Sequence, residues 1–303
     1  MKFKLLIIGY SSLVRRRVIA TLVRNNIPYD VASRSKVKQD KKAQNWYSGY
    51  EKALKNSDAN IAYISLPNSM HYYWGLRALK KGFHTLIDKP ATINLKQLKK
   101  LINISNKSKK ILSESIFFNY HNQMKFALNQ IKKNKIVSIN ANFLIPKPSK
   151  DSIHSSKKLK GGVIMDMGPY IAALSRLFFK SLPKKIIKNV TYRNKISSRL
   201  EILFIYKGSY FEGKFSHNDE YKNFIKIYSK NKVVELSRVF SPPALENLKV
   251  LETKFNKINT KVFSDDVFKN YIEEVFRLIK AKKFKYYQKQ MIHDIKIREI
   301  IQK

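Results

Sequence analysis

The sequence predicts an α/β protein in two parts: a doubly wound parallel sheet, then an α+β domain with a mainly antiparallel sheet. In the first part, short apolar runs alternate with segments of helical spacing, which is typical of βαβ units. In the second part, runs of alternating polarity are separated by short gaps such as Lys207-Gly208-Ser209, which favour hairpins. With 303 residues, 44% of them hydrophobic, the chain can form two cores. We therefore expect domains at 1–118 and 119–303.

The first part contains strands that end at punctuating residues such as Pro67, and a helix that ends at Gly82. The expected strands are 2–8, 29–33, 60–66, 85–87 and 110–114, and the expected helices are 12–25, 40–46, 71–80 and 94–106. Ligands of doubly wound sheets bind beyond the carboxyl ends of the strands. The ligand site should therefore lie near Gly9, Ser33, Leu66 and Asp88.

In the second part the period of the hydrophobic pattern changes between helical and strand-like segments. The expected helices are 122–133, 167–179, 265–279 and 289–301, and the expected strands are 136–144, 186–192, 199–206, 210–216, 223–228 and 232–236. No internal repeat or low-complexity segment interrupts them.

The composition excludes several classes of protein. The chain has no cysteine, so it has no disulfide and no thiolate site, and we predict no metal site. No apolar run is long enough to span a bilayer and no signal peptide is recognisable, so we expect a cytoplasmic protein without a membrane partner. The net charge of +40 would suit a nucleic acid, but the lysines are scattered along the chain. Compositional drift explains them better, and we expect no specific nucleic-acid partner.

The first turn, Gly9-Tyr10-Ser11-Ser12-Leu13-Val14, partly follows the dinucleotide fingerprint G-x-G-x-x-G. Only Gly9 matches, with Ser11 and Val14 in the other two places. Backbone N–H groups of such a turn can still face a pyrophosphate at a helix amino end. We assign Gly9, Ser11, Ser12 and Leu13 to cofactor binding, although a turn without ligand has the same pattern.

The segment after the second strand favours NADP(H) over NAD(H). NAD-binding proteins place a carboxylate there for the ribose 2′-hydroxyl. Here Ser33, Arg34 and Ser35 follow Ala32 instead, and a guanidinium with hydroxyls suits a 2′-phosphate. A solvated loop is the alternative.

Two further strand ends carry polar residues. Leu66-Pro67-Asn68 and His71 follow the third strand, where a cofactor ribose would lie, although helix capping also explains them. Asp88-Lys89-Pro90 follows the fourth, and a lysine directly after a buried strand needs a partner for its charge. We assign these residues to the cofactor site, and Lys89 also to catalysis.

The segment Gly161-Gly162 precedes a helix that carries Asp166 and Tyr170. Residues four apart lie on one helix face, so the carboxylate and the phenol can share a site if the helix starts early enough. A positioned phenol can donate or accept a proton during catalysis. Packing in the core is the alternative for Tyr170.

Together these segments resemble the Gfo/Idh/MocA oxidoreductase family over nearly the whole chain. The matching segments are the nucleotide turn, 66–71, Asp88-Lys89-Pro90 (E-K-P in the family), 114–123 (like E-x-F-x-Y-R-F-H-P-Q) and 161–170 (like G-G-G-x-x-x-D-x-G-x-H). The resemblance implies a Rossmann domain followed by an open-faced α/β domain whose sheet often joins subunits. We therefore expect a homodimer or homotetramer through that sheet.

The resemblance also implies roles for single residues. The family's catalytic lysine falls on Lys89, its aspartate on Asp166, and its usual histidine on Tyr170, as in a branch that includes nucleotide-sugar ketoreductases. Asn119, His121 and Asn122 fall in its substrate segment. Departures are Asp88 for glutamate, Asn119 for arginine, Asn122 for proline and Ala173 for aspartate. The shorter acid and the lost arginine bear on the geometry of the nicotinamide pocket and on the anchoring of the substrate.

The function that these residues imply is NADP(H)-dependent reduction of a keto-sugar, nucleotide-linked and anionic, in a deoxysugar or surface-polysaccharide pathway. Hydride transfer would be coupled to a Tyr170 and Lys89 proton relay. Two alternatives stay open: a dehydrogenase of a free sugar, inositol or diol, and a non-catalytic binding protein that keeps the fold.

Overall fold

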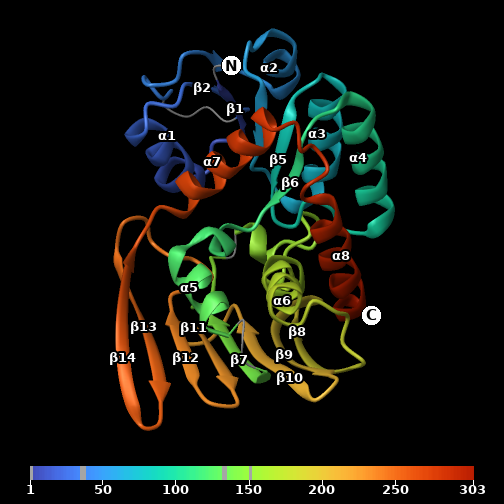
Figure 1. Cartoon of the computed structure of the whole chain (residues 1–303). Coiled ribbons are helices and arrows are strands. Elements are labelled where there is room, and N and C mark those ends of the chain that lie inside the picture. Colours follow the sequence, from blue (N-terminus) through green and yellow to red (C-terminus); the bar gives the residue numbers. More distant parts are fainter. Residues whose placement is uncertain (1–2, 35–38, 132–134, 150–151) are drawn as a thin grey trace. The chain divides into compact units, whose positions relative to one another are not determined.

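The computed structural model describes residues 3–34, 39–131, 135–149 and 152–303 (Figure 1). It divides into two compact units. Unit 1 comprises residues 1–115 and 268–295, and unit 2 comprises 116–267 and 296–303. The chain therefore leaves unit 1 near the expected boundary at 118 but returns to it later.

Unit 1 is built on a six-stranded parallel sheet of order β3-β2-β1-β4-β5-β6. Its strands are β1 (Leu5–Ile8), β2 (Tyr29–Ala32), β3 (Trp46–Tyr47), β4 (Ile61–Ile64), β5 (His84–Asp88) and β6 (Leu112–Ser115). The helices between them are a π-helical segment (Val14–Ile19) continued by α1 (Ala20–Arg24), then α2 (Tyr50–Asn56), α3 (Asn68–Lys80) and α4 (Leu95–Ser108). The order reverses after β1, which puts the carboxyl ends of β1 and β4 at the switch point where such sheets bind ligands. The predicted fold class of this part is confirmed.

The segment between β2 and α3 differs from the prediction. The expected helix at 40–46 is wrong, because this segment is held as a loop against β2: the Tyr29 hydroxyl donates to Asp40 (2.8 Å) and the Asn45 amide donates to Asp30 (3.1 Å). The chain then forms the short strand β3 and the helix α2, which the sequence pattern did not indicate.

The helix α7 (Val267–Lys280) lies almost wholly in unit 1, whereas the sequence suggested a place in the second domain. Its aromatic face explains this. Phe276 stacks on Phe3 with 4.1 Å between ring centroids, and the Tyr271 hydroxyl, completely buried, accepts a hydrogen bond from Ser115 (3.2 Å). The last helix, α8 (Gln288–Gln302), contributes residues to both units.

Unit 2 contains an eight-stranded sheet of order β14-β13-β12-β11-β7-β10-β9-β8. All neighbours are antiparallel except β7 and β10. The strands are β7 (Ile136–Leu144), β8 (Lys185–Arg193), β9 (Ile196–Tyr206), β10 (Ser209–Ser216), β11 (Lys222–Ser229), β12 (Val233–Ser237), β13 (Asn247–Lys254) and β14 (Lys257–Ser264). The helical segments are η2 (Phe117–Tyr120), α5 (Asn122–Ile131), η3 (Ile153–Ser155) and α6 (Val163–Phe179).

One face of this sheet forms a hydrophobic core with α5 and α6, so alternate residues of its central strands are buried. The mainly antiparallel sheet confirms the predicted class. The hairpin β13–β14 was not predicted. Nearly every residue of β14 is exposed, so no burial pattern marks that strand in the sequence. The strand β13 does alternate, with Leu248 and Val250 buried, so its pattern was a signal that was missed.

Candidate active site

The turn that we predicted to bind the nucleotide follows β1 in unit 1. Gly9 has φ of 106°, and its N–H donates to the Ala32 carbonyl (3.0 Å). A side chain here would collide with the backbone, because an added Cβ would lie 2.0 Å from the Ser65 carbonyl oxygen. This close approach of β1 to the end of β4 explains why glycine is needed.

The next three residues of the turn, Ser11, Ser12 and Leu13, are exposed beyond the end of β1. The Ser11 hydroxyl accepts a hydrogen bond from the Val14 amide (3.2 Å) and so caps the start of the helix. The backbone N–H groups of this helix start can face an anion, as expected of a nucleotide turn.

Beyond β2, Ser33 is buried and its amide donates to the Tyr47 carbonyl (3.0 Å). Arg34 is exposed, with its guanidinium 5.0 Å from the centre of the Tyr50 ring and 3.8 Å from the Met70 sulfur. This cation is therefore held at the sheet edge rather than extended into solvent. Ser35, the third residue assigned here, lies outside the described residues.

The ends of β4 and β5 are joined by His71, which is buried on α3. Its Nδ1 lies 2.8 Å from the Pro90 carbonyl oxygen and its Nε2 lies 2.6 Å from the Leu66 carbonyl oxygen. Both ring nitrogens therefore contact backbone, and His71 braces the two loops. Pro67 precedes the first helical residue, Asn68, so α3 begins three residues before the expected start.

Asp88 is the last residue of β5. Its carboxylate accepts hydrogen bonds from the hydroxyl of Tyr63, in the neighbouring strand β4, and from that of Ser65, which follows β4. Lys89 follows, half-buried, and the Lys89–Pro90 peptide is cis. The Ala91 amide donates to the Glu114 carboxylate (2.7 Å). The loop that carries the lysine is thus held at both ends.

Asp166 and Tyr170 lie in unit 2, one turn apart on α6. The helix starts at Val163, earlier than predicted, so the two side chains share a face. The Tyr170 ring is half-buried among aromatic rings, with centroids 5.4 Å from Phe240 and 5.8 Å from Phe118. Packing thus fixes the ring.

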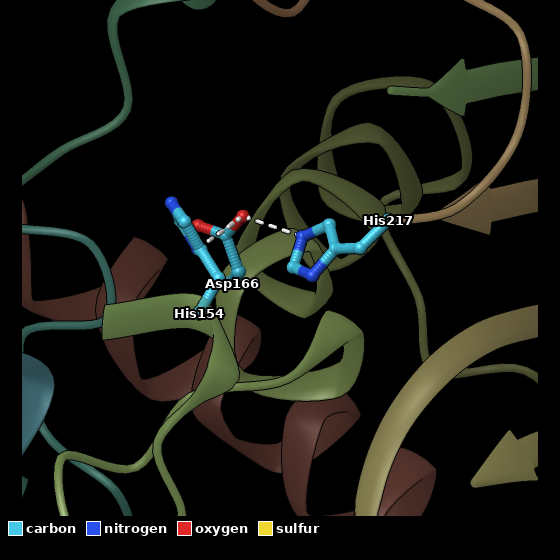
Figure 2. Close-up of side chains that lie close together, drawn as sticks. All are labelled: His154, Asp166 and His217. Carbon is cyan, nitrogen blue, oxygen red and sulfur yellow. Dashed lines mark hydrogen bonds and ion pairs between the residues drawn. The ribbon is translucent and has the colours of Figure 1, made fainter. Parts of the chain in front are cut away.

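Two residues that the sequence did not single out contact Asp166. Its carboxylate oxygen Oδ2 lies 3.0 Å from Nε2 of His217 and 3.4 Å from Nδ1 of His154 (Figure 2). His217 follows β10 and His154 lies in η3, far away in the sequence. No regular spacing in the sequence links these two histidines to Asp166. The one signal that could have drawn attention to them is that the chain has only 6 histidines.

The residues assigned to substrate lie at the start of unit 2. Asn119 is half-buried in η2, and its Oδ1 has no hydrogen-bond partner among the described residues. His121 is completely buried, its Nδ1 accepts from the Gln123 amide (3.1 Å), and burial lowers its pKa. The Asn122 amide donates to Asp265 (2.7 Å), which caps α5, while its side chain is exposed.

In the described ranges no helix is both long and apolar enough to cross a membrane.

Solved structures of other proteins share the fold of this chain. A 3-ketoreductase from Actinomadura kijaniata, KijD10, solved with NADP and TDP-benzene, has the same fold, with a TM-score of 0.90 at 21% identity over 99% of this chain and 96% of that chain. An aldose-aldose oxidoreductase from Caulobacter crescentus also shares it, with a TM-score of 0.87 at 13% identity over 100% of this chain and 97% of that chain.

Curated relatives include several dTDP-3,4-didehydro-2,6-dideoxy-alpha-D-glucose 3-reductases. That of Streptomyces violaceoruber is 29% identical over 57% of this chain and 53% of the relative, so the match spans about half of the relative's length. That of Saccharopolyspora spinosa is 24% identical over 78% of this chain and 75% of the relative. Residues 3–116 match the model of an oxidoreductase family with an NAD-binding Rossmann fold. This is the Gfo/Idh/MocA family, which the sequence motifs also resemble.

Proposed function

We propose that this protein reduces a keto-sugar with NADPH, and that the sugar is carried on a nucleotide, as in pathways to deoxysugars or surface polysaccharides. The observation that carries the proposal is Tyr170 one helical turn after Asp166, in a chain similar to dTDP-sugar 3-reductases. A phenol fixed by packing is a suitable proton donor for a ketone.

The residues of unit 1 fit the cofactor. The Gly9 backbone leaves no room for a side chain, the exposed turn at 11–13 presents helix-start amides, and the segment after β2 offers Arg34 where NAD-binding proteins have a carboxylate. We assign the pyrophosphate to the turn and the 2′-phosphate to Arg34. Leu66, Pro67, Asn68 and Asp88 would line the nicotinamide end.

The chemistry that bound NADPH supplies is hydride donation to the carbonyl carbon. In the proposed mechanism, Tyr170 gives its proton to the carbonyl oxygen as negative charge develops there. Lys89 stabilises that charge, and Asp166 orients the lysine or a sugar hydroxyl. His217 in turn orients the Asp166 carboxylate, with which it forms a 3.0 Å hydrogen bond.

The test is turnover of a dTDP-linked 3-keto-sugar with NADPH by the full chain. We expect Tyr170→Phe and Lys89→Ala each to reduce kcat by about 100-fold or more, because general acid catalysis contributes roughly 10²–10⁴ in rate. NADPH binding, followed by nicotinamide fluorescence, should persist in Tyr170→Phe. Near-normal turnover in both variants would contradict the mechanism, and absence of NADPH binding by the wild-type chain would favour a non-catalytic protein.

The second candidate is oxidation of a free sugar or diol. Similarity to a D-xylose 1-dehydrogenase (NADP(+)) of Haloferax volcanii, 28% identical over 48% of this chain and 45% of the relative, favours it. The same residues serve both directions of hydride transfer. Turnover of free aldoses with NADP⁺, without activity on the nucleotide-linked sugar, would select this candidate.

A further inference from the structure

We propose that His154, Asp166 and His217 form a binding site for one divalent transition-metal ion of the Zn²⁺ class. All three belong to unit 2, so the site does not depend on how the two units are arranged. From the sequence we predicted no metal site, because the chain has no cysteine. The three residues proposed here also lie far apart in the chain, without a regular spacing that would mark them as ligands. The proposal goes beyond the proposed reductase function and does not rest on it. A bound ion would replace the His217 hydrogen bond as the contact that holds the Asp166 carboxylate.

Two of the three separations between the ligand atoms are close to those of a tetrahedral site. One nitrogen from each imidazole and one carboxylate oxygen all lie within 4.8 Å of one another. Two of the separations are 3.0 Å and 3.4 Å. Ligands about 2.0–2.1 Å from a tetrahedral Zn²⁺ lie about 3.3–3.4 Å apart, so modest movements of these side chains would accommodate the ion.

The three side chains come from separate segments that are held in place. Figure 2 shows them converging from η3, the first turns of α6 and the chain after β10. The Gly162 amide donates to the His154 carbonyl (3.0 Å), and a Cβ on Gly161 would lie 2.3 Å from the Ile153 carbonyl oxygen. The glycine pair therefore lets η3 pack onto the start of α6, which brings His154 to Asp166.

Burial and donor chemistry favour a transition metal. The side chains of His217 and Asp166 are 5% and 14% exposed, whereas that of His154 is 32% exposed. Two ligands are thus sheltered and the cluster is accessible at the third. Two imidazoles with one carboxylate is a donor set for Zn²⁺ and other first-row metals, whereas Mg²⁺ and Ca²⁺ prefer oxygen donors. The fourth position would take water or an oxygen atom of a small ligand.

The experiment is a titration of the full chain, freed of metal with a chelator, with CoCl₂, since Co²⁺ reports its coordination by visible absorption. We expect one Co²⁺ bound per chain and displaced by Zn²⁺. Asp166→Asn and His217→Gln should each weaken binding by at least about 100-fold, because loss of an outer-shell partner alone costs 10–100-fold.

His293→Gln is the matched control, because Nδ1 of His293 also lies 3.4 Å from a carboxylate, that of Asp294, without belonging to the cluster. It should bind Co²⁺ like the wild type. Zn²⁺ should also raise the thermal unfolding midpoint of the wild-type chain but not of His217→Gln, which separates loss of the site from loss of the fold.

The outcomes separate this proposal from the reductase. Tyr170→Phe should lose turnover but keep Co²⁺ binding, since the phenol is not a ligand. Absence of stoichiometric Co²⁺ binding, or binding unchanged in both Asp166→Asn and His217→Gln, would overturn the metal site and leave the reductase proposal standing.

Discussion

Arg34 lies in the segment after β2, where NAD-binding proteins carry an acidic residue. Its guanidinium lies 5.0 Å from the centre of the Tyr50 ring and also contacts Met70. The side chain would therefore lose little further conformational entropy when it binds a phosphate. A charge-assisted hydrogen bond contributes about 1.5–3 kcal/mol, which corresponds to roughly a 10–100-fold change in affinity.

We therefore expect Arg34→Ala to raise the Kd for NADPH by about tenfold or more while the Kd for NADH changes little. Fluorescence titration with the two cofactors measures this. Lys42→Ala, which removes an exposed cation from the neighbouring loop, is the control. Equal effects of Arg34→Ala on both cofactors would show that the residue does not contact the 2′-phosphate.

His84 is a second residue at this scale, and its buried environment should make the free energy of unfolding depend on pH. It is buried at the start of β5, and its Nδ1 accepts a hydrogen bond from the Ile111 amide (3.0 Å). Burial, assisted by the charge of Lys110, lowers the pKa of the imidazole to about 4, against about 6.5 in an unfolded chain. The folded protein therefore binds fewer protons than the unfolded chain between these values.

By linkage, the free energy of unfolding should fall as the pH falls from about 6.5 to about 4, by up to about 1.4 kcal/mol per pH unit from this group. Below that window the contribution should be constant. His84→Gln keeps an acceptor for the Ile111 amide but does not titrate, so it should flatten the slope. Urea unfolding at several pH values tests this, and an unchanged slope in the variant would contradict it.

At the scale of elements, the link from β1 to the following helix depends on one glycine. Gly9 combines a positive φ of 106° with backbone contact at the Cβ position. Gly82, at the end of α3, has a positive φ of 85° but nothing within 4 Å of an added Cβ. Alanine substitutions at the two positions therefore separate the cost of a positive φ from the cost of a steric collision.

Gly82→Ala should cost about 1–2 kcal/mol of stability through strain alone. Gly9→Ala should cost about 1–3 kcal/mol more, because β1 and the end of β4 must move apart. It should also weaken NADPH binding, whereas Gly82→Ala should not. Denaturant unfolding and cofactor titration measure the two effects. Equal costs for the two variants would show that the collision is relieved without penalty.

At the scale of the whole molecule, the net charge of +40 creates a positive field that attracts anions. NADPH carries one phosphate more than NADH, so its binding should depend more strongly on salt. We expect the Kd for NADPH to rise several-fold between about 0.05 and 0.5 M NaCl, and that for NADH to rise less. Titration of both cofactors tests this. Tight, steeply salt-dependent binding to DNA would instead favour the nucleic-acid interpretation.

The oligomeric state also belongs to this scale. Association of two or four copies through the sheet of unit 2 stays a prediction, and analytical ultracentrifugation can test it.

Apart from β3, α2, β13, β14 and the short segments η2 and η3, the order of strands and helices could be read from the sequence, since periodicity is a local property of the chain. The prediction was wrong or missing mainly for segments whose structure depends on distant partners or that have no buried face. Residues 40–46 follow the edge of β2 rather than their own helical pattern, and β14 is exposed along nearly its whole length.

Local sequence was enough to predict the two-part α/β architecture, the tight turn at Gly9, and Asp166 with Tyr170 on one helix, because each depends on neighbours within a few turns of chain. Only the tertiary structure decided that α7 completes unit 1, that His71 braces two loops, and that His154 and His217 meet at Asp166. These features join residues far apart in the chain, and their proximity follows from packing rather than from any local pattern.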